Sequence, residues 1–219
     1  MPISDQQLFS AIQRKLNEPP DGGQSFFTQR WTHDELVRVA ADRQDALLKA
    51  THLQIGMAQS GVIAGVLEEQ AGNPLVGLPD DWIATVALIR FPADARPYLV
   101  DLGDSWQADM ADRTLVGAAG TPKLCFDAET PSRTLRLVPA PATPAPLLLY
   151  YVPRAAVLTG TGEYCTVPDE VATSVLQYGI LADLLAKTGR GQDLPRANYC
   201  RARWQLGVEV TEILLKGLA

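Results

Sequence analysis

The chain has 219 residues, of which 47% are apolar and 20% are charged. This is the composition of an ordinary globular protein, so it excludes a disordered tail, a collagen-like rod and a low-complexity chain. The longest apolar runs, at 83–89 and 147–152, are far shorter than the ~20 residues of a membrane-spanning helix. The first residues lack the basic start and apolar segment of a secretory signal. We therefore expect a soluble protein without a membrane partner.

Charge is unevenly distributed along the chain. The 19 basic and 25 acidic residues give a net charge of −6, which argues against a general nucleic-acid-binding protein. Residues 61–189 carry 8 basic and 15 acidic residues, whereas 190–219 carry 5 basic and 3 acidic. Two interpretations fit this pattern: two solvated surfaces, or an acidic face combined with a basic end that binds a partner.

Cysteine and histidine are too sparse for a metal site. Cys125, Cys165 and Cys200 are odd in number and widely spaced, which is typical of reduced, partly buried thiols rather than of a disulfide framework. His33 and His52 are the two histidines, and no CxxC occurs. A zinc site needs about four closely grouped nitrogen or sulfur ligands. We expect no metal and no cofactor.

Two capping boxes predict helix starts near the N-terminus. Ser4 pairs with Gln7, and Thr32 pairs with Glu35, the spacing at which each side chain can satisfy the other's backbone N–H. Apolar residues at helical spacing follow each box, to about residue 16 and about residue 53. A cap of this kind stabilises a helix by ~1 kcal/mol. Two helices are therefore predicted, joined by a Pro- and Gly-rich loop.

The middle of the chain changes to strand-like patterns. Short apolar or alternating runs predict strands at 83–91, 98–102, 123–126, 134–138 and 147–152. The first run is almost continuously apolar, which is typical of a strand buried on both faces. Four prolines between 139 and 146 cannot occupy a central strand, so this segment is predicted to be a hairpin connection at a sheet edge. A short helix is possible at Asp104–Met110.

The last third returns to helix. Pro168, followed by Asp169 and Glu170, places proline and acidic residues in a first helical turn. Asp193 with Pro195 opens a last helix that runs through the tryptophan at 204 toward residue 218. The order helix–helix, strands, helix–helix predicts an α+β fold.

The predicted architecture is a helical body of N- and C-terminal helices with an inserted small antiparallel β unit. Its helical parts cover about 1–55 and 165–219, and the β-rich insertion covers about 60–163. We expect one domain over residues 1–219.

Catalytic constellations are weak. Glycines at 160–162 and 189–191 lack the remainder of a phosphate-binding loop. The adjacent carboxylates Glu68–Glu69, Asp80–Asp81 and Asp169–Glu170 could in principle supply an acid and a base. Their positions at turns and helix starts favour solvated or capping acids. The four tryptophans are scattered and fit a core or an interface better than a base-stacking platform. We predict no catalytic residue and no enzyme.

Several segments, in this order and spacing, resemble the head-to-tail adaptor proteins of tailed bacteriophages. The resemblance covers most of the chain and rests on Trp31–Leu36 opening a long helix, Leu78–Asp81 leading into 83–91, Gly120–Asp127, Leu135–Pro141, 147–152, Val167–Glu170 leading into a helix with Tyr178, and the helix start at Asp193–Tyr199. In the GxPxxYxxD pattern, Cys125 stands where an aromatic residue is expected.

The resemblance implies a structural virion protein of the neck or tail, assembled in the host cytoplasm. It implies a ring of twelve copies that joins the portal protein to a tail tube or nozzle protein and lets DNA pass without sequence-specific binding. We expect the C-terminal helix to contact a neighbour or the portal through Arg196, Arg201, Arg203 and Trp204.

Three alternatives remain open at this point. The chain could be another neck or tail-completion protein, a cytoplasmic carboxylate-dependent enzyme, or an accessory DNA-binding protein that uses the C-terminal arginines. The last predicts salt-sensitive DNA binding.

Overall fold

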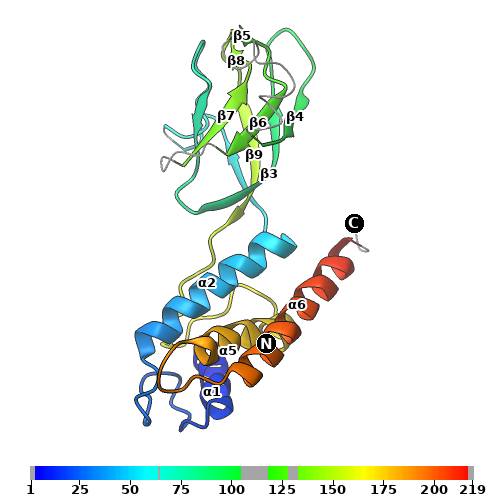
Figure 1. The fold of residues 1–219 in the computed structure, drawn as a ribbon. Helices are drawn as coiled ribbons and strands as arrows, with labels where there is room; N and C mark the ends of the chain where they lie inside the picture. Colours follow the sequence, from blue (N-terminus) through cyan, green and yellow to red (C-terminus); the bar gives the residue numbers. More distant parts are fainter. Residues whose placement is uncertain (1–2, 64, 105–117, 128–132, 217–219) are drawn as a thin grey trace. The chain divides into compact units, whose positions relative to one another are not determined.

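A computed structural model of the chain describes residues 3–63, 65–104, 118–127 and 133–216. The chain divides into two compact units (Figure 1). The helical unit combines residues 1–54 with 154–219, and the sheet unit spans Ile55–Pro153. The possible helix at Asp104–Met110 falls on 105–117, outside the described residues. The expectation of one domain over the whole chain stays a prediction.

The helical unit is built from the helices that the sequence predicts. Their bounds are α1 (Asp5–Lys15), α2 (His33–Thr51), α4 (Asp169–Val171), the π-helical turn η1 (Ala172–Leu176), α5 (Gln177–Ala186) and α6 (Leu194–Lys216). Both capping boxes are confirmed. Ser4 Oγ accepts the Gln7 N–H at 3.3 Å, and Thr32 Oγ1 accepts the Glu35 N–H at 3.2 Å.

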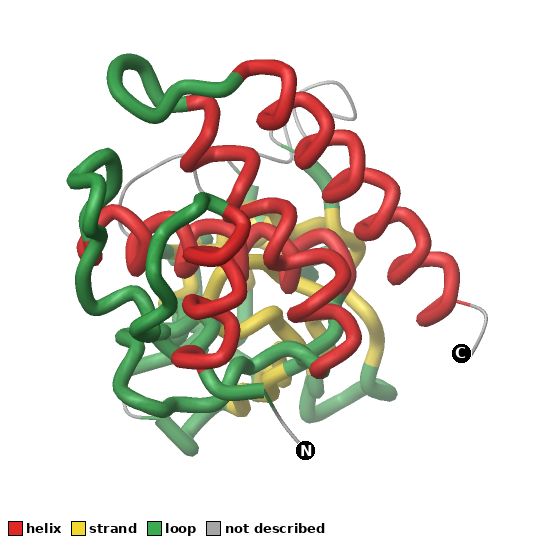
Figure 2. The backbone as a smooth tube through the Cα atoms, turned by 90° about the horizontal axis from the view of Figure 1, so that it is seen from below, coloured by secondary structure: helices red, strands yellow, loops and turns green. Residues whose placement is uncertain are grey.

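Helices α4, η1 and α5 follow one another without a break, and α2, α5 and α6 pack together (Figures 1 and 2). Pro168 has an extended backbone and precedes the first turn instead of lying within it. The buried side chains of this unit come from every long helix, among them Leu8, Leu36, Leu47, Ile180 and Trp204. Packing of these apolar faces is what stabilises the helices.

The sheet is larger than the small β unit that the sequence predicts, although the unit that contains it, Ile55–Pro153, is about as long as the predicted insertion. Among the described residues the main sheet of this unit has the strand order β1-β9-β3-β4-β6-β7-β2. The bounds are β1 (Gly56–Gln59), β2 (Leu75–Gly77), β3 (Trp82–Arg90), β4 (Tyr98–Leu102), β6 (Leu124–Asp127), β7 (Thr134–Val138) and β9 (Leu147–Pro153). Neighbours are antiparallel except for β4 and β6, which are parallel. The expectation of a purely antiparallel unit is therefore wrong.

The proline-rich segment after β7 is not the predicted hairpin. β9 lies between β1 and β3, whereas β7 lies between β6 and β2. The segment therefore carries the chain from one part of the sheet to another, and its strand β8 (Ala140–Pro141) pairs with β5 (Ala119–Gly120). Proline prevents a central strand here, as expected, but it does not decide which strands the segment connects.

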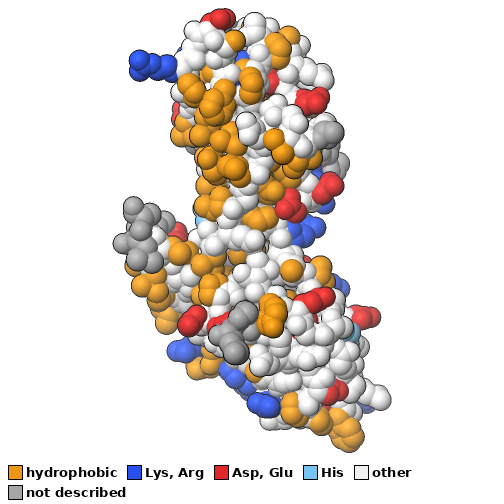
Figure 3. Space-filling model, turned by 180° about the vertical axis from the view of Figure 1, so that it is seen from behind, with side chains coloured by type: hydrophobic (Ala, Val, Ile, Leu, Met, Phe, Trp, Pro, Cys, Tyr) orange, Lys and Arg blue, Asp and Glu red, His pale blue; other side chains and the backbone are white. Residues whose placement is uncertain are grey.

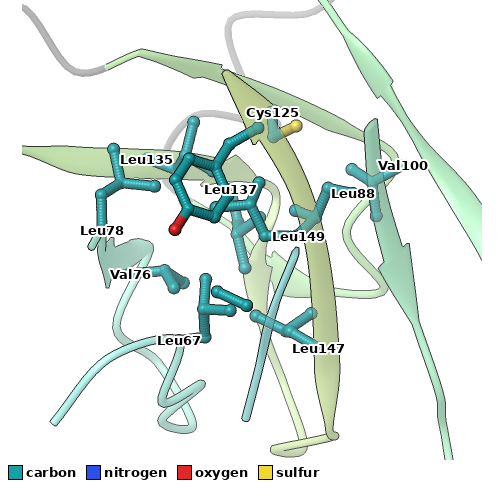
Figure 4. Packing of buried hydrophobic residues seen from close by; sticks show 12 residues of the cluster. Leu67, Val76, Leu78, Leu88, Val100, Cys125, Leu135, Leu137, Leu147 and Leu149 are labelled. Atoms are coloured by element: carbon teal, nitrogen blue, oxygen red, sulfur yellow. The ribbon is translucent and has the colours of Figure 1, made fainter. Parts of the chain in front are cut away.

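Apolar residues on the inner face of the sheet form the core of this unit. Figure 4 shows Leu88, Val100, Leu137 and Leu149 projecting from β3, β4, β7 and β9 into one cluster, with Cys125 beside them. In β3, Leu88 and Arg90 are buried and the other side chains are half-buried. The predicted burial of this strand on both faces is thus not seen in the single chain.

The stability of the sheet unit depends on pH in the alkaline range because of Tyr151, a buried residue of β9. Burial, together with the hydrogen bond that its phenol donates to Asp81 Oδ1 at 3.0 Å, raises the pKa of Tyr151 to about 12. The unfolded chain releases this proton near the ordinary pKa of ~10. The protonated Tyr151 therefore contributes its full stabilisation of the folded state below pH ~10, and this contribution is lost as pH rises toward 12.

We expect the tyrosinate absorbance of the folded protein to show one tyrosine that titrates near pH 12. This step should be absent from the Tyr151→Phe variant. Tyr164 is exposed, so Tyr164→Phe is the matched control and should leave the step in place. A Tyr151→Phe protein with the wild-type titration curve would contradict the assignment.

Candidate interaction surface

Helix α6 carries all four residues that the sequence analysis singled out. It begins after Asp193, whose Oδ1 accepts the Arg196 N–H at 3.1 Å and whose carbonyl accepts the Ala197 N–H at 2.8 Å. This arrangement satisfies donors that the first turn of a helix otherwise leaves unpaired. The predicted start at Asp193 is confirmed.

The inner face of α6 packs tightly because two glycines remove side chains from the contact. A Cβ atom at Gly179 of α5 would lie 2.4 Å from the Trp204 ring, and one at Gly207 would lie 2.7 Å from Val175. Trp204 is 8% exposed, and Ala197 and Cys200 on the same face are also buried. This face therefore belongs to the core of the helical unit.

Trp204 also contacts a charged side chain from α2. The Arg43 guanidinium lies 5.3 Å from the centre of the Trp204 ring. The same guanidinium donates to both carboxylate oxygens of Asp183 on α5, with Nε to Oδ2 at 2.5 Å. Arg43 thus connects α2, α5 and α6 through one ion pair and one cation–π contact.

The three arginines occupy different surroundings. Arg196 donates to the carbonyl of Lys15 and lies 3.8 Å from an Asp193 oxygen. Arg203 lies 5.3 Å from the centre of the Tyr178 ring, and Lys15 Nζ lies 4.4 Å from it. All three arginines have exposed side chains, and Arg201 donates only a long hydrogen bond, 3.4 Å, to Asn198 among the interactions of the described residues.

A shallow cavity of about 560 Å³ lies beside the start of α6. Arg30, Arg190 and Arg196 line it together with Trp31 and the capping residue Asp193. The structure therefore brings Arg190 and Arg196, both in the basic end at 190–219 that the sequence analysis described, together with Arg30, which it did not place near them. The positive charge of this surface follows from loop residues whose contacts with α6 depend on the tertiary fold.

Helix α6 also has an exposed apolar stripe, which the sequence analysis missed. Its members are Tyr199, Leu206, Val210, Ile213 and Leu214. Spacings of three, four and seven residues place them on one side of an α-helix. A helix with apolar residues on two sides typically packs against a different surface on each side. This pattern was visible in the sequence, but the sequence analysis described the last helix only by its extent and by its arginines and Trp204.

The paired carboxylates have structural partners. Glu69 is buried and accepts from Arg90 Nε at 2.9 Å, so the expectation that it is a solvated or capping acid is wrong. Asp81 accepts the Tyr151 phenol, and Asp169 accepts the Ile3 N–H at 2.6 Å. These contacts hold segments together. Asp169 and Glu170 also line one open cavity of about 690 Å³, beside Ser4, Gln7 and Tyr164.

The described residues contain no group of three or more His, Cys, Asp or Glu side chains that could hold a metal ion. The three cysteines are free and buried, as predicted. Burial raises the pKa of the Cys165 thiol to about 11, and the nearby Asp5 and Asp169 act in the same direction. None of the helices in the described part of the chain combines the length and the hydrophobicity that crossing a membrane requires.

The model of the SU10 adaptor protein family matches residues 6–209. The chain belongs to this family of phage head-to-tail adaptors. A search of the curated proteins finds no match to the sequence. The matched region includes the sheet unit, most of the helical unit and α6 as far as residue 209, so Val210, Ile213 and Leu214 of the stripe lie beyond it.

The adaptor family consists of structural phage proteins, which interact with other virion components in the neck. For an adaptor, the useful chemistry is surface complementarity rather than catalysis. The exposed part of α6 carries three arginines in its first half and an apolar stripe that extends from Tyr199 to Leu214.

Proposed function

We propose that this adaptor forms a ring of twelve copies that joins the portal protein to a tail tube or nozzle protein. The observation that carries the proposal is the exposed apolar stripe of α6 in a chain of the adaptor family. Exposed apolar stripes of this kind are typical of protein interfaces. A cyclic ring uses contacts in which one surface of a subunit meets a different surface of its neighbour.

The charge of the adaptor supports the passage of DNA through the ring without sequence-specific binding. The chain has a net charge of −6, and the sheet unit alone carries 11 acidic and 6 basic residues. An excess of acidic groups repels phosphates and does not trap the genome. We place the adaptor in the neck, as one domain over 1–219, with assembly in the host cytoplasm.

The four predicted interface residues take different roles in this proposal. Arg201 and Arg203 are exposed and available to a neighbour or to the portal. Arg196 contributes to the arginine-lined cavity. Trp204 does not contact the partner itself. It packs against α5 and fixes the orientation of α6.

The proposal is tested by measuring mass in solution, for the adaptor alone and mixed with the portal protein. We expect a complex with one adaptor per portal subunit. Removing α6 is a poor test, because truncation also removes the buried Trp204. The double variant Arg201→Glu, Arg203→Glu should weaken the complex, whereas Arg38→Glu, an exposed arginine of α2, is the matched control and should not.

An adaptor that does not bind the portal protein and stays monomeric in the mixture would contradict the proposal. In that case, DNA binding is measured at two salt concentrations. Binding that weakens steeply with salt and is lost in the Arg201→Glu, Arg203→Glu variant would favour the accessory DNA-binding protein instead.

A further inference from the structure

The sheet unit has a second apolar surface, on the outer face of strands β1, β9, β3 and β4. Ala58, Leu149, Leu88 and Val100 point into the core. Because successive strand residues alternate between faces, the neighbours of these residues point outward. Most of the outward residues are also apolar, namely Met57, Leu148, Tyr150, Ile89 and Leu99, whereas Gln59 and Asp101 on the same side are polar. We call this set the outer sheet face.

The strand register places these outward residues beside one another. Ile89 lies opposite Leu148 on one side and opposite Leu99 on the other, and Met57 lies opposite Tyr150. Met57 is 63% exposed and Leu99 is 59% exposed. Figure 3 shows hydrophobic side chains gathered at the surface of the sheet unit on the side that it presents.

An apolar outer face is unusual for an antiparallel sheet. Sheets of this kind alternate apolar residues inside with polar residues outside when one face meets water. The nearly continuous apolar runs of β3 and β9 are instead typical of strands that are covered on both faces. The inner face is covered by the core of the unit itself, so the pattern indicates that something else covers the outer sheet face.

We infer that the apolar stripe of α6 in one copy packs on the outer sheet face of the next copy, an inference that rests on the proposed ring. A helix laid on a sheet is a standard way to bury two apolar surfaces of these shapes. The two surfaces differ and lie on different units, as a head-to-tail contact requires. Contact between two copies therefore buries the α6 stripe of one copy and the outer sheet face of the other.

Charge complementarity supports a second copy as the occupant. Helix α6 carries 4 basic and 2 acidic residues, whereas the sheet unit has a net charge of −5. Next to the α6 stripe the signs are mixed, since Glu209 precedes Val210, but one pair of opposite charges flanks the two apolar surfaces. Arg203 lies between Tyr199 and Leu206 on the α6 stripe, and the exposed Asp101 follows Leu99 on the same side of β4. Opposite charges at the rim of an apolar contact favour its register and its rate of formation.

The test uses two variants that each damage one surface. Ile213→Asp places a charge on the α6 stripe, where the native side chain is 68% exposed, and Leu99→Asp places one on the outer sheet face. Each variant alone should be monomeric by sedimentation, because every contact in a ring uses both surfaces. An equimolar mixture should form a dimer, since the intact sheet of one variant meets the intact α6 of the other.

Val157→Asp is the matched control, because Val157 is similarly exposed but belongs to neither surface. It should assemble as the wild type does, and all three variants should retain the wild-type circular dichroism. Three results overturn the inference: a single variant that assembles normally, a mixture that stays monomeric, or a wild-type chain that stays monomeric at all concentrations. A wild-type chain that still binds the portal with one copy per subunit would leave the proposed function intact.

Discussion

Replacing Glu69 by Gln should destabilise the sheet unit by about 3–5 kcal/mol, the cost of leaving a buried charge without its partner. The Glu69 side chain is fully buried, and the Arg90 side chain is 3% exposed. Burial alone would lower the pKa of Arg90, but its hydrogen bonds to Glu69 and Tyr98 raise it. The guanidinium therefore stays charged and needs a carboxylate.

Glu69 also holds the proline-rich segment to the sheet. Its Oε2 accepts the Ala145 N–H at 2.5 Å, while Arg90 Nη2 donates to the Thr143 carbonyl at 2.6 Å. These two hydrogen bonds fix the segment that leads from β7 to β9. The oxygen of a glutamine amide can accept a hydrogen bond from one of the two donors that face Glu69, Arg90 Nε and the Ala145 N–H. The NH₂ group of the amide would face the second donor, with which it cannot form a hydrogen bond. The loss should therefore exceed that of a single hydrogen bond.

Urea denaturation of Glu69→Gln, followed by circular dichroism, measures this effect. Asp80→Asn is the control, because Asp80 is fully exposed and lies 3.6 Å from Arg133. Exposed pairs of this kind contribute about 0–1 kcal/mol. A free energy of unfolding for Glu69→Gln that lies within this range of the wild-type value would contradict a structural role for the buried pair.

Local signals explain which parts of the fold were predictable. The capping boxes at Ser4 and Thr32 are read from residues three apart, and both are confirmed. Strand β4 was predicted with the bounds that the structure has. Strands β1 and β2 were missed because each is short and contains glycine, so neither has a clear alternation.

Non-local pairing explains the rest. The parallel pair of β4 with β6 and the position of β9 between β1 and β3 depend on contacts across the sheet. No local pattern distinguishes these arrangements from a simple meander. The partner of Glu69 is likewise 21 residues away in sequence, so its burial could not be inferred from its position at a turn. The outer sheet face was visible only as an excess of apolar residues.

Replacing Trp204 by Ala should lower the free energy of unfolding of the helical unit by about 3–5 kcal/mol, the usual cost of truncating a buried aromatic side chain. Trp204 is buried against Gly179 and beneath the Arg43 guanidinium. The effect should appear in the denaturation of the isolated monomer, before any assembly. Tyr199→Ala is the control, since Tyr199 is an exposed aromatic residue of the same helix. Equal losses for the two variants would contradict the placement of Trp204.

The contact between Gly179 and Trp204 allows a second test of the packing of Trp204. Gly→Ala in a helix usually stabilises by up to ~1 kcal/mol, but a Cβ atom at residue 179 would lie 2.4 Å from the Trp204 ring. Gly179→Ala alone should therefore destabilise, by about 1–3 kcal/mol as in other overpacked cores. In the Trp204→Ala background the ring is gone, so the same change should become neutral or stabilising. A double-mutant cycle measures this reversal, and additive effects would show that α5 and α6 do not pack through these two residues.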